Sequence, residues 1–338
     1  MAGPFPEFDP YLNDPDGWGV SLAQMTELLA PCLDAAGARS VAEVGAFAGD
    51  LTRVLVTWAA GAGARVSAID PAPQEGLIEL AHAHPELELI RETSLAALPR
   101  IDLPDAIVID GDHNYYTVSE ELRLIGERAP GDELPLLLFH DVRWPHGRRD
   151  DYFDVEQIPE RSRHPVAGKG GGGLYPGDPG LRPGGLPYPR SAAREGGPGN
   201  GVLTAVEDFV ATRKDVRLAV VPAFFGFGVA WHADKPWAAD VAGILDPFDR
   251  HPILERLEAN RVRHLARGHT WRHELWQANE RIARQEEVLR RLLDSSAFSV
   301  AEQLSRLRAL AGVAPAQSIV SKDEIRRALV DSARRGPG

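Results

Sequence analysis

The segment from residue 40 to residue 141 alternates short apolar runs with amphipathic stretches, and this alternation limits the possible folds more than any other feature. The runs are apolar at nearly every position, which is typical of parallel strands covered by helices on both faces. We predict strands at 40–45, 65–70, 87–92, 106–110 and 134–141, with helices at 50–60, 74–84 and 117–128 between them. The chain should therefore form a layered α/β domain.

A second ordered region begins near residue 202 and completes the predicted sheet. Residues 202–213 have the apolar spacing of a helix, and residues 216–232 contain two apolar runs that meet near Gly226. Two strands joined by so short a turn must be antiparallel. We therefore predict a seven-stranded, mostly parallel sheet with an antiparallel terminal hairpin and a C-terminal helical extension.

We predict three regions along the chain, with an insertion in the second. Residues 1–37 form an N-terminal helical segment, residues 38–235 form the α/β domain, and residues 236–338 form the helical extension. The domain is interrupted at 143–201 by a segment too rich in glycine and proline for regular elements, either an ordered lid or a disordered loop. The extension is mostly polar but has an interrupted apolar stripe, which could pair with another chain or cover its own domain. We expect a homo-oligomer formed through these helices.

The composition excludes several classes of protein. A formal net charge of −12 argues against a nucleic-acid-binding surface, because phosphate binding needs basic patches. The sequence contains no run of eighteen apolar residues and no secretory leader at its start, so we expect a cytoplasmic protein that does not span a membrane. Cys32 is the only cysteine and lies in a helical apolar pattern, where an inert buried thiol is expected.

The first predicted strand ends in a glycine-containing turn, AEVGAFAGD, at residues 42–50. Phe47 occupies the position where a dinucleotide site needs its second glycine, and Glu43 places a carboxylate beside the turn, where pyrophosphate would be repelled. A ligand with an ammonium and a sulfonium group suits such a turn better. Asp70 ends the second strand about twenty residues later, where an acid can accept hydrogen bonds from both ribose hydroxyls. These residues favour S-adenosylmethionine (SAM) over NAD.

Acidic residues follow the fourth and fifth predicted strands. Asp110 ends the fourth strand and Asp141 follows the fifth, so a parallel sheet brings both to the same edge, where ligands of such sheets bind. Clustered carboxylates are costly unless something offsets their charge. A divalent cation would offset it and would also lower the pKa of a hydroxyl bound to it.

These features together resemble class I SAM-dependent methyltransferases, which have a Rossmann-like fold. The shared features are the EVGAFAG run at 43–49, the acid Asp70, the DGDHNY run at 110–115 and the HD pair at 140–141. The aromatic residue Phe47 is similar to that of catechol and caffeoyl-CoA O-methyltransferases. The DGDHNY run resembles the metal-dependent group that contains macrocin O-methyltransferases, which act on macrolide sugars, and cephalosporin-hydroxylase-like proteins. The resemblance covers about residues 38–232 and excludes the insertion and the helical extension.

The resemblance implies a set of cofactor-binding residues. Glu43 would hold the methionine amino group, Gly45 and Gly49 would pass the methionine moiety, Asp70 would bind the ribose, and Ser94 would lie near the adenine. Phe47 belongs to the same set through its place in the turn. Glu43 could instead be a helix-capping or surface acid, and Ser94 could cap the helix that follows; the sequence leaves both alternatives open.

The resemblance also implies a metal site and a general base. Asp110, beside the expected sulfonium, would hold Mg²⁺ or Mn²⁺ together with Asp141 and His140, and Asp112 would be either a further ligand or a helix cap. His140 departs from the family, since an acid or amide is usual there, so either the metal differs or this side chain points elsewhere. His113 matches the family's proposed general base, because an ordinary imidazole pKa near 6.5 suits proton abstraction at neutral pH. Cofactor or loop contacts without metal are the alternative for Asp110 and Asp141, and hydrogen bonds that hold the strand-to-helix loop are the alternative for His113.

The function predicted from the sequence is SAM-dependent methylation of a hydroxyl on a small polar acceptor, assisted by a divalent metal. A glycosylated natural product or a nucleotide sugar is the expected acceptor class. The run RWPHGRRDDY at 143–152 either contacts this acceptor or is a solvated loop. The two rival functions are an NAD-dependent oxidoreductase and a non-catalytic scaffold that keeps the fold.

Overall fold

A computed structural model describes residues 21–129, 133–166, 168, 172–312 and 320–335 of the chain. These residues divide into two compact units, one ending at Thr270 and the other beginning at Trp271. The predicted N-terminal segment 1–37 lies within the described residues only from residue 21 onward, where the 3₁₀ helix η1 (Leu22–Met25) leads into α3 (Thr26–Ala35).

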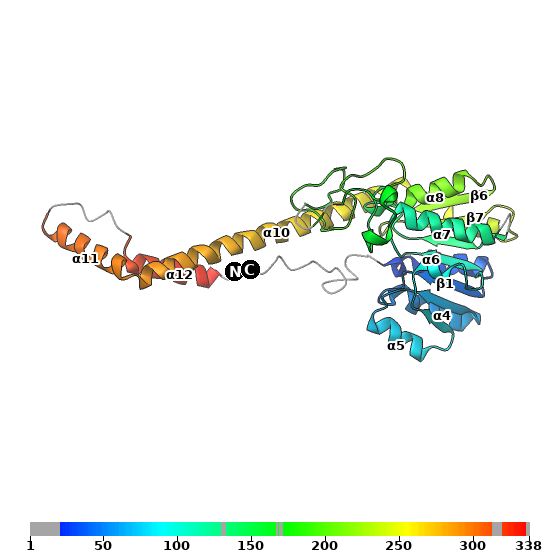
Figure 1. Cartoon of the computed structure of the whole chain (residues 1–338), viewed down its shortest axis with the longest axis horizontal. Helices are drawn as coiled ribbons and strands as arrows, with labels where there is room; N and C mark the ends of the chain where they lie inside the picture. Colours follow the sequence, from blue (N-terminus) through cyan, green and yellow to red (C-terminus); the bar gives the residue numbers. More distant parts are fainter. Residues whose placement is uncertain (1–20, 130–132, 167, 169–171, 313–319, 336–338) are drawn as a thin grey trace. The chain divides into compact units, whose positions relative to one another are not determined.

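The first unit contains the predicted seven-stranded sheet, in the order β3-β2-β1-β4-β5-β7-β6 (Figure 1). Its strands are β1 (Ser40–Val44), β2 (Arg65–Ile69), β3 (Leu87–Ile90), β4 (Ala106–Ile109), β5 (Leu136–Phe139), β6 (Val216–Val221) and β7 (Phe227–His232). Strands β1 to β5 are parallel, and β7 is antiparallel to both β5 and β6. The Rossmann-like fold predicted from the sequence is therefore confirmed.

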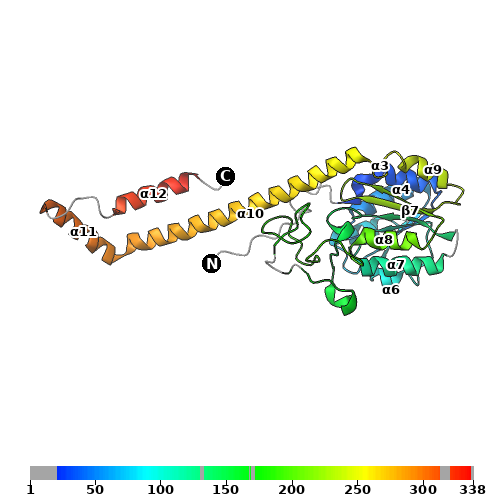
Figure 2. The same cartoon turned by 90° about the horizontal axis from the view of Figure 1, so that it is seen from above.

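Helices cover both faces of this sheet, as the apolar strands require (Figure 2). One face packs against α3, α4 (Asp50–Ala62), α5 (Glu75–Ala83) and α9 (Ala238–Leu245). The other packs against α6 (Ser94–Ala97), α7 (Tyr115–Arg128) and α8 (Val202–Ala211). Full burial of each large aliphatic side chain contributes about 1.5–3 kcal/mol to stability. Cys32 lies in the first of these layers, where burial raises the pKa of its thiol to about 12.

The described part of the insertion folds against the sheet without long regular elements. It contains three short 3₁₀ helices, η3 (His146–Arg148), η4 (Val155–Gln157) and η5 (Glu160–Ser162). Isolated β-bridges join Asp151 to Ser191, Val166 to Ala192, Gly173 to Arg182 and Leu174 to Leu186. The Arg149 side chain is fully buried and donates hydrogen bonds to backbone carbonyls of the insertion. These contacts give the described part of the insertion an ordered structure.

Asp150 ties the insertion to the sheet. One carboxylate oxygen accepts hydrogen bonds from the backbone N–H groups of Tyr115, at 2.8 Å, and of Gly201, at 2.7 Å. The other accepts the Tyr152 hydroxyl at 2.9 Å. The side chain is completely buried, so these bonds are needed to offset its desolvation. The two ends of the insertion are thereby held to the start of α7.

The helical extension begins with α9 and continues as α10 (Pro252–Asp294), α11 (Ser296–Leu310) and α12 (Lys322–Arg335). The start of α10 belongs to the first unit, where Val262 and Ala266 are buried. The two compact units therefore divide inside α10, whereas the sequence predicted a boundary after residue 235. Among the described residues, none of the helices is both long and apolar enough to cross a membrane.

Candidate functional site

The turn after β1 fits against the end of β4 with no room for a side chain at Gly45. Gly45 has φ of 85°, and a Cβ atom there would lie only 2.2 Å from the carbonyl oxygen of Asp110. The neighbouring turn at Asp110 therefore requires glycine at this position. This reason is independent of the close ligand approach that the sequence predicts. Gly49 is the N-cap residue of α4, with φ of 88°, and it is not among the residues that line the cavity described below.

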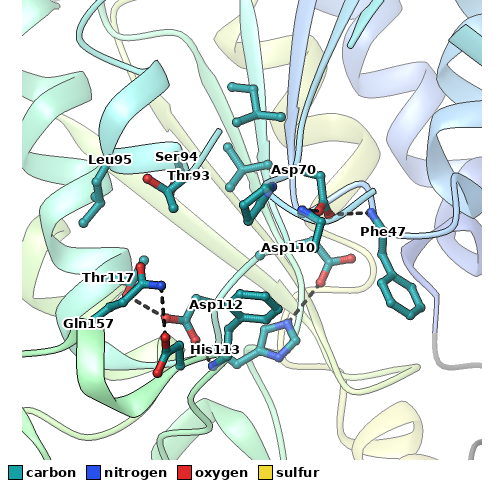
Figure 3. Close-up of a pocket in the computed structure, with 18 of the residues that line it drawn as sticks. Phe47, Asp70, Thr93, Ser94, Leu95, Asp110, Asp112, His113, Thr117 and Gln157 are labelled. Atoms are coloured by element: carbon teal, nitrogen blue, oxygen red, sulfur yellow. Dashed lines mark hydrogen bonds and ion pairs between the residues drawn. The ribbon is translucent and has the colours of Figure 1, made fainter. Parts of the chain in front are cut away.

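A cavity of about 420 Å³ opens at the carboxyl ends of β1, β2 and β4 (Figure 3). Its lining includes most of the site residues predicted from the sequence: Gly45, Phe47, Asp70, Ser94, Asp110, Asp112, His113, His140 and Asp141. The structure thus brings together in space residues that are far apart along the chain.

Glu43 is not part of this lining. Its carboxyl group is buried and accepts a hydrogen bond from the Thr52 hydroxyl of α4 at 2.6 Å. Burial raises the pKa of Glu43 to about 8, although the bond from Thr52 acts in the opposite direction. The structure therefore does not bring Glu43 to the cavity, and the residue connects β1 to the first turn of α4.

Asp70 shapes the cavity wall where β2 ends. One of its carboxylate oxygens accepts the backbone N–H of Phe47 at 2.7 Å, and the other accepts that of Ala72 at 2.7 Å. Each oxygen retains capacity for a further hydrogen bond. Asp70 thus fixes the Phe47 turn and can also accept ribose hydroxyls.

Asp110, His140 and Asp141 form a compact group at the ends of β4 and β5, and one potential ligand atom from each lies within 4.8 Å of the others. His140 Nδ1 is 3.1 Å from Asp110 Oδ1 and 3.4 Å from Asp141 Oδ2. The His140 ring therefore points toward both acids. Asp141 has a left-handed backbone, with φ of 55°, which turns the chain sharply after the strand.

The charges of this group depend strongly on one another. Burial opposes ionisation of Asp110, but the adjacent His140 and His113 more than offset it and lower the pKa of Asp110 to about 2. Burial likewise disfavours the imidazolium of His140, yet Asp110 and Asp141 raise its pKa to about 9. In the absence of a cation, protonated imidazoles neutralise the carboxylates.

His113 lies beside the same acids. Its Nε2 is 3.2 Å from Asp141 Oδ2 and 3.4 Å from Asp110 Oδ1. Burial lowers its pKa, but Asp141 and Asp110 outweigh burial and raise the pKa to about 10. The ordinary pKa expected from the sequence is therefore not the one found here, because two carboxylates stabilise the charged ring.

Asp112 is held by hydrogen bonds and lies outside the metal-ligand group. Its Oδ1 accepts the backbone N–H of Phe153 at 2.8 Å, and its Oδ2 accepts the Thr117 hydroxyl at 2.9 Å. Asn114, rather than Asp112, caps α7. The carboxylate of Asp112 therefore joins the insertion to α7 at the cavity wall and does not cap the helix.

Ser94 lies across the cavity from Phe47, at the start of α6 (Figure 3). It is buried and forms no capping bond, and Thr93 occupies the N-cap position. Thr117 and Gln157 border the same side of the cavity. The described position is compatible with the predicted adenine contact.

The sequence analysis missed the contribution of the insertion to this cavity. Phe153, Asp154, Gln157 and Ile158 all line it, together with Tyr116 of α7. The only indication in the sequence was the polar run at 143–152, which follows the fifth strand directly and therefore begins at the ligand-binding edge of the sheet. The insertion is irregular, so its sequence has no hydrophobic periodicity from which its contacts with the cavity could be predicted.

A second group of possible ligands adjoins the first. His113, His146 and Asp151 each place one ligand atom within 4.8 Å of the others. The His113 and His146 rings are stacked, with centroids 5.2 Å apart, and the backbone N–H of Asp151 donates to the carbonyl of His113 at 3.0 Å. Part of the polar run 143–152 therefore lies at the site rather than in a solvated loop.

Comparison with known proteins agrees with the location of this site. Residues 42–142 match the family model of a methyltransferase domain. This segment includes the glycine turn, Asp70 and all three members of the Asp110, His140 and Asp141 group. This part of the chain is thus similar to a methyltransferase domain, and the match ends just after Asp141.

Several solved structures are similar to the chain at low sequence identity. The SAH-bound methyltransferase PaMTH1 of Podospora anserina has 13% identity and a TM-score of 0.40, with 66% of this chain and 84% of that chain covered. The O-methyltransferase TomG of Streptomyces achromogenes, solved with SAM, has 17% identity and a TM-score of 0.37, with coverages of 63% and 82%. A Geobacter sulfurreducens methyltransferase has 14% identity and a TM-score of 0.37, with coverages of 68% and 92%. A search of curated protein sequences gives no match.

Proposed function

We propose that this protein is a SAM-dependent O-methyltransferase that methylates a hydroxyl of a small polar acceptor with the help of a divalent cation. The observation that carries the proposal is the Asp110, His140 and Asp141 group, which opens into the cavity walled by Asp70. The match of residues 42–142 to a methyltransferase domain supports the same conclusion.

The cavity residues divide into those that suit each part of the cofactor. SAM, when bound, supplies the methyl group from a sulfonium centre. Asp70 would accept the ribose hydroxyls, Ser94 would contact the adenine, and Asp110 would face the positively charged end. The exposed ring of Phe47 borders the opening and would shield the bound cofactor from water. Glu43 would not contact the cofactor but would hold the turn between β1 and α4 through its bond with Thr52.

The donor set fits a divalent cation. His140 Nε2 lies 2.8 Å from the carbonyl oxygen of Phe224, which can only accept, so this nitrogen carries a hydrogen. Nδ1 then directs its lone pair, in the neutral ring, toward Asp110 and Asp141. An imidazole oriented by a carbonyl next to two carboxylates is a common metal-binding arrangement, and it suits Mn²⁺ better than Mg²⁺. The cation, when bound, would lower the pKa of the acceptor hydroxyl.

His113 would take the proton of the acceptor hydroxyl. It lies at the cavity wall, within 3.4 Å of both Asp110 and Asp141. The two carboxylates keep its pKa high, and a cation shared by the same carboxylates would lower it toward the neutral range, where a general base is effective. We retain a glycosylated natural product or a nucleotide sugar as the proposed acceptor class.

Calorimetric titration tests this function. S-adenosylhomocysteine is expected to bind with a dissociation constant in the micromolar range, and NAD is expected to give no heat of binding. Asp70→Ala should weaken S-adenosylhomocysteine at least tenfold, because it removes the acceptor of the ribose hydroxyls and frees the Phe47 turn. Asp102→Ala, a surface substitution outside the cavity, is the control and should bind like the wild type.

Two results would contradict the proposal. Binding of NAD without binding of S-adenosylhomocysteine would favour the oxidoreductase. Absence of any binding of S-adenosylhomocysteine or Mn²⁺ in the wild type would favour the non-catalytic scaffold.

Self-association through the C-terminal helices is also proposed. Trp271, Leu275 and Ile282 of α10 are 65%, 51% and 45% exposed, which is unusual for large apolar side chains at helical spacing. We expect sedimentation equilibrium to give a multiple of the 36.8 kDa chain mass. Replacing both Leu275 and Ile282 with Lys should reduce the mass toward that of one chain, whereas Glu287→Lys should not. A wild-type protein that sediments as one chain would refute this proposal.

A further inference from the structure

The turn between β6 and β7 has a strained backbone next to the site. Phe224 and Phe225 both adopt left-handed conformations, with φ of 50° and 65°. Each such residue costs roughly 1–3 kcal/mol when it is not glycine, so surrounding contacts must hold the turn in place. The carbonyl of Phe224 is the group that accepts the hydrogen bond from His140.

Glu258, in the second turn of α10, supplies these contacts. Its carboxylate accepts the backbone N–H of Phe225 at 2.8 Å and that of Phe224 at 3.2 Å. Arg261 donates two hydrogen bonds to the same carboxylate, at 2.6 and 2.7 Å. The guanidinium of Arg261 also lies 4.4 Å from the centre of the Phe225 ring. Glu258 is 8% exposed, so little water competes for these bonds.

A continuous set of contacts therefore runs from α10 to the predicted metal ligand. Glu258 fixes the two N–H groups of the turn, the turn fixes the Phe224 carbonyl, and that carbonyl holds the Nε2–H of His140 at 2.8 Å. If the carbonyl moved away, the Nε2–H of His140 would lose its acceptor, and the ring could turn so that Nδ1 no longer faces Asp110 and Asp141.

We propose that Glu258 is a positioning residue for the site: it fixes the orientation of the His140 ring through the Phe224 carbonyl. This inference rests on the proposed function for its consequence, because the fixed orientation of the ring matters for binding a cation. The hydrogen-bond chain itself does not depend on the cation. Outer contacts of this kind typically change metal affinity by about 10- to 100-fold.

The test compares Glu258→Ala with Glu255→Ala. Glu255 lies one helical turn earlier in α10 and pairs with Arg143, without a bond to the Phe224 turn. In the metal-free wild type, nuclear magnetic resonance of ¹⁵N-histidine-labelled protein should show a slowly exchanging Nε2–H of His140, assigned by its loss in His140→Asn. Glu258→Ala should lose this signal or exchange it at least tenfold faster, and Glu255→Ala should keep it.

Titration with Mn²⁺ then measures the consequence. We expect the dissociation constant to rise by about 10- to 100-fold in Glu258→Ala and by less than twofold in Glu255→Ala. Glu258→Gln keeps one acceptor oxygen, so its dissociation constant for Mn²⁺ should lie between those of the wild type and Glu258→Ala. This variant keeps the test possible if Glu258→Ala folds poorly.

The outcomes separate this inference from the proposed function. An unchanged Nε2–H signal in both Glu258 variants would overturn the positioning role. An altered signal with unchanged Mn²⁺ affinity would overturn its consequence for the metal site. A wild type that binds no Mn²⁺, but whose Nε2–H signal responds to Glu258→Ala, would refute metal assistance and support the positioning role.

Discussion

Asp110→Asn is expected to abolish measurable Mn²⁺ binding and to reduce methyl transfer by roughly a thousandfold. Asparagine has nearly the same shape but lacks the charge that Asp110 retains even when buried, with its pKa lowered to about 2. The substitution also removes the negative partner of His140, 3.1 Å away, and of His113, 3.4 Å away. Metal binding by calorimetry and turnover with a radiolabelled methyl donor would measure the two effects separately.

Asp208→Asn is the matched control for this prediction. Asp208 accepts a hydrogen bond from the Tyr115 hydroxyl at 2.8 Å and does not line the cavity. This variant should bind Mn²⁺ and S-adenosylhomocysteine like the wild type. Near-normal Mn²⁺ affinity in Asp110→Asn would show that the Asp110, His140 and Asp141 group is not a metal site.

Gly45→Ala is expected to lower the free energy of unfolding by about 3 kcal/mol or more. The added methyl group would lie 2.2 Å from the carbonyl oxygen of Asp110 and 2.4 Å from the Cα atom of Gly111. Both are backbone atoms, so the clash cannot be relieved by rotating a side chain. Alanine also resists the φ of 85° at this position. Urea denaturation followed by circular dichroism would measure the loss.

Gly61→Ala should raise the free energy of unfolding, in contrast to Gly45→Ala. Gly61 lies in α4, and a Cβ atom there meets nothing within 4 Å. Alanine is a better helix former than glycine, so we expect a gain of about 0.5–1 kcal/mol. If the two alanine variants had equal stability, the close approach between the β1 and β4 turns would not be a constraint on the sequence.

The parts of the fold that depend on local pattern could be predicted from the sequence. Each strand of the parallel sheet is a separate apolar run, and the edge at which its last residue lies follows from the direction of the chain. The proximity of Asp110 and Asp141 follows from that geometry alone. Phe47 and Asp70 reach the cavity for the same reason, since both follow strand ends.

The parts that depend on contacts between irregular segments could not be predicted. The direction of Glu43 is decided by the alternation of β1 side chains and by Thr52 on α4, which a turn motif does not reveal. The pKa of His113 depends on two acids whose distances are set only in the folded protein. The position of Glu258 against Phe224 joins a helix to a turn without any sequence signature.

The division of the compact units within α10 matters for anyone who shortens the chain. A fragment that stops at residue 235, after the last strand, would contain every predicted catalytic residue. It would lack α9, whose apolar face covers the sheet, and it would lack Glu258, whose carboxylate restrains the Phe224 turn. A fragment that extends to Thr270 would keep both. The smallest fragment that keeps the first compact unit whole therefore includes the start of α10, whose remainder belongs to the second unit.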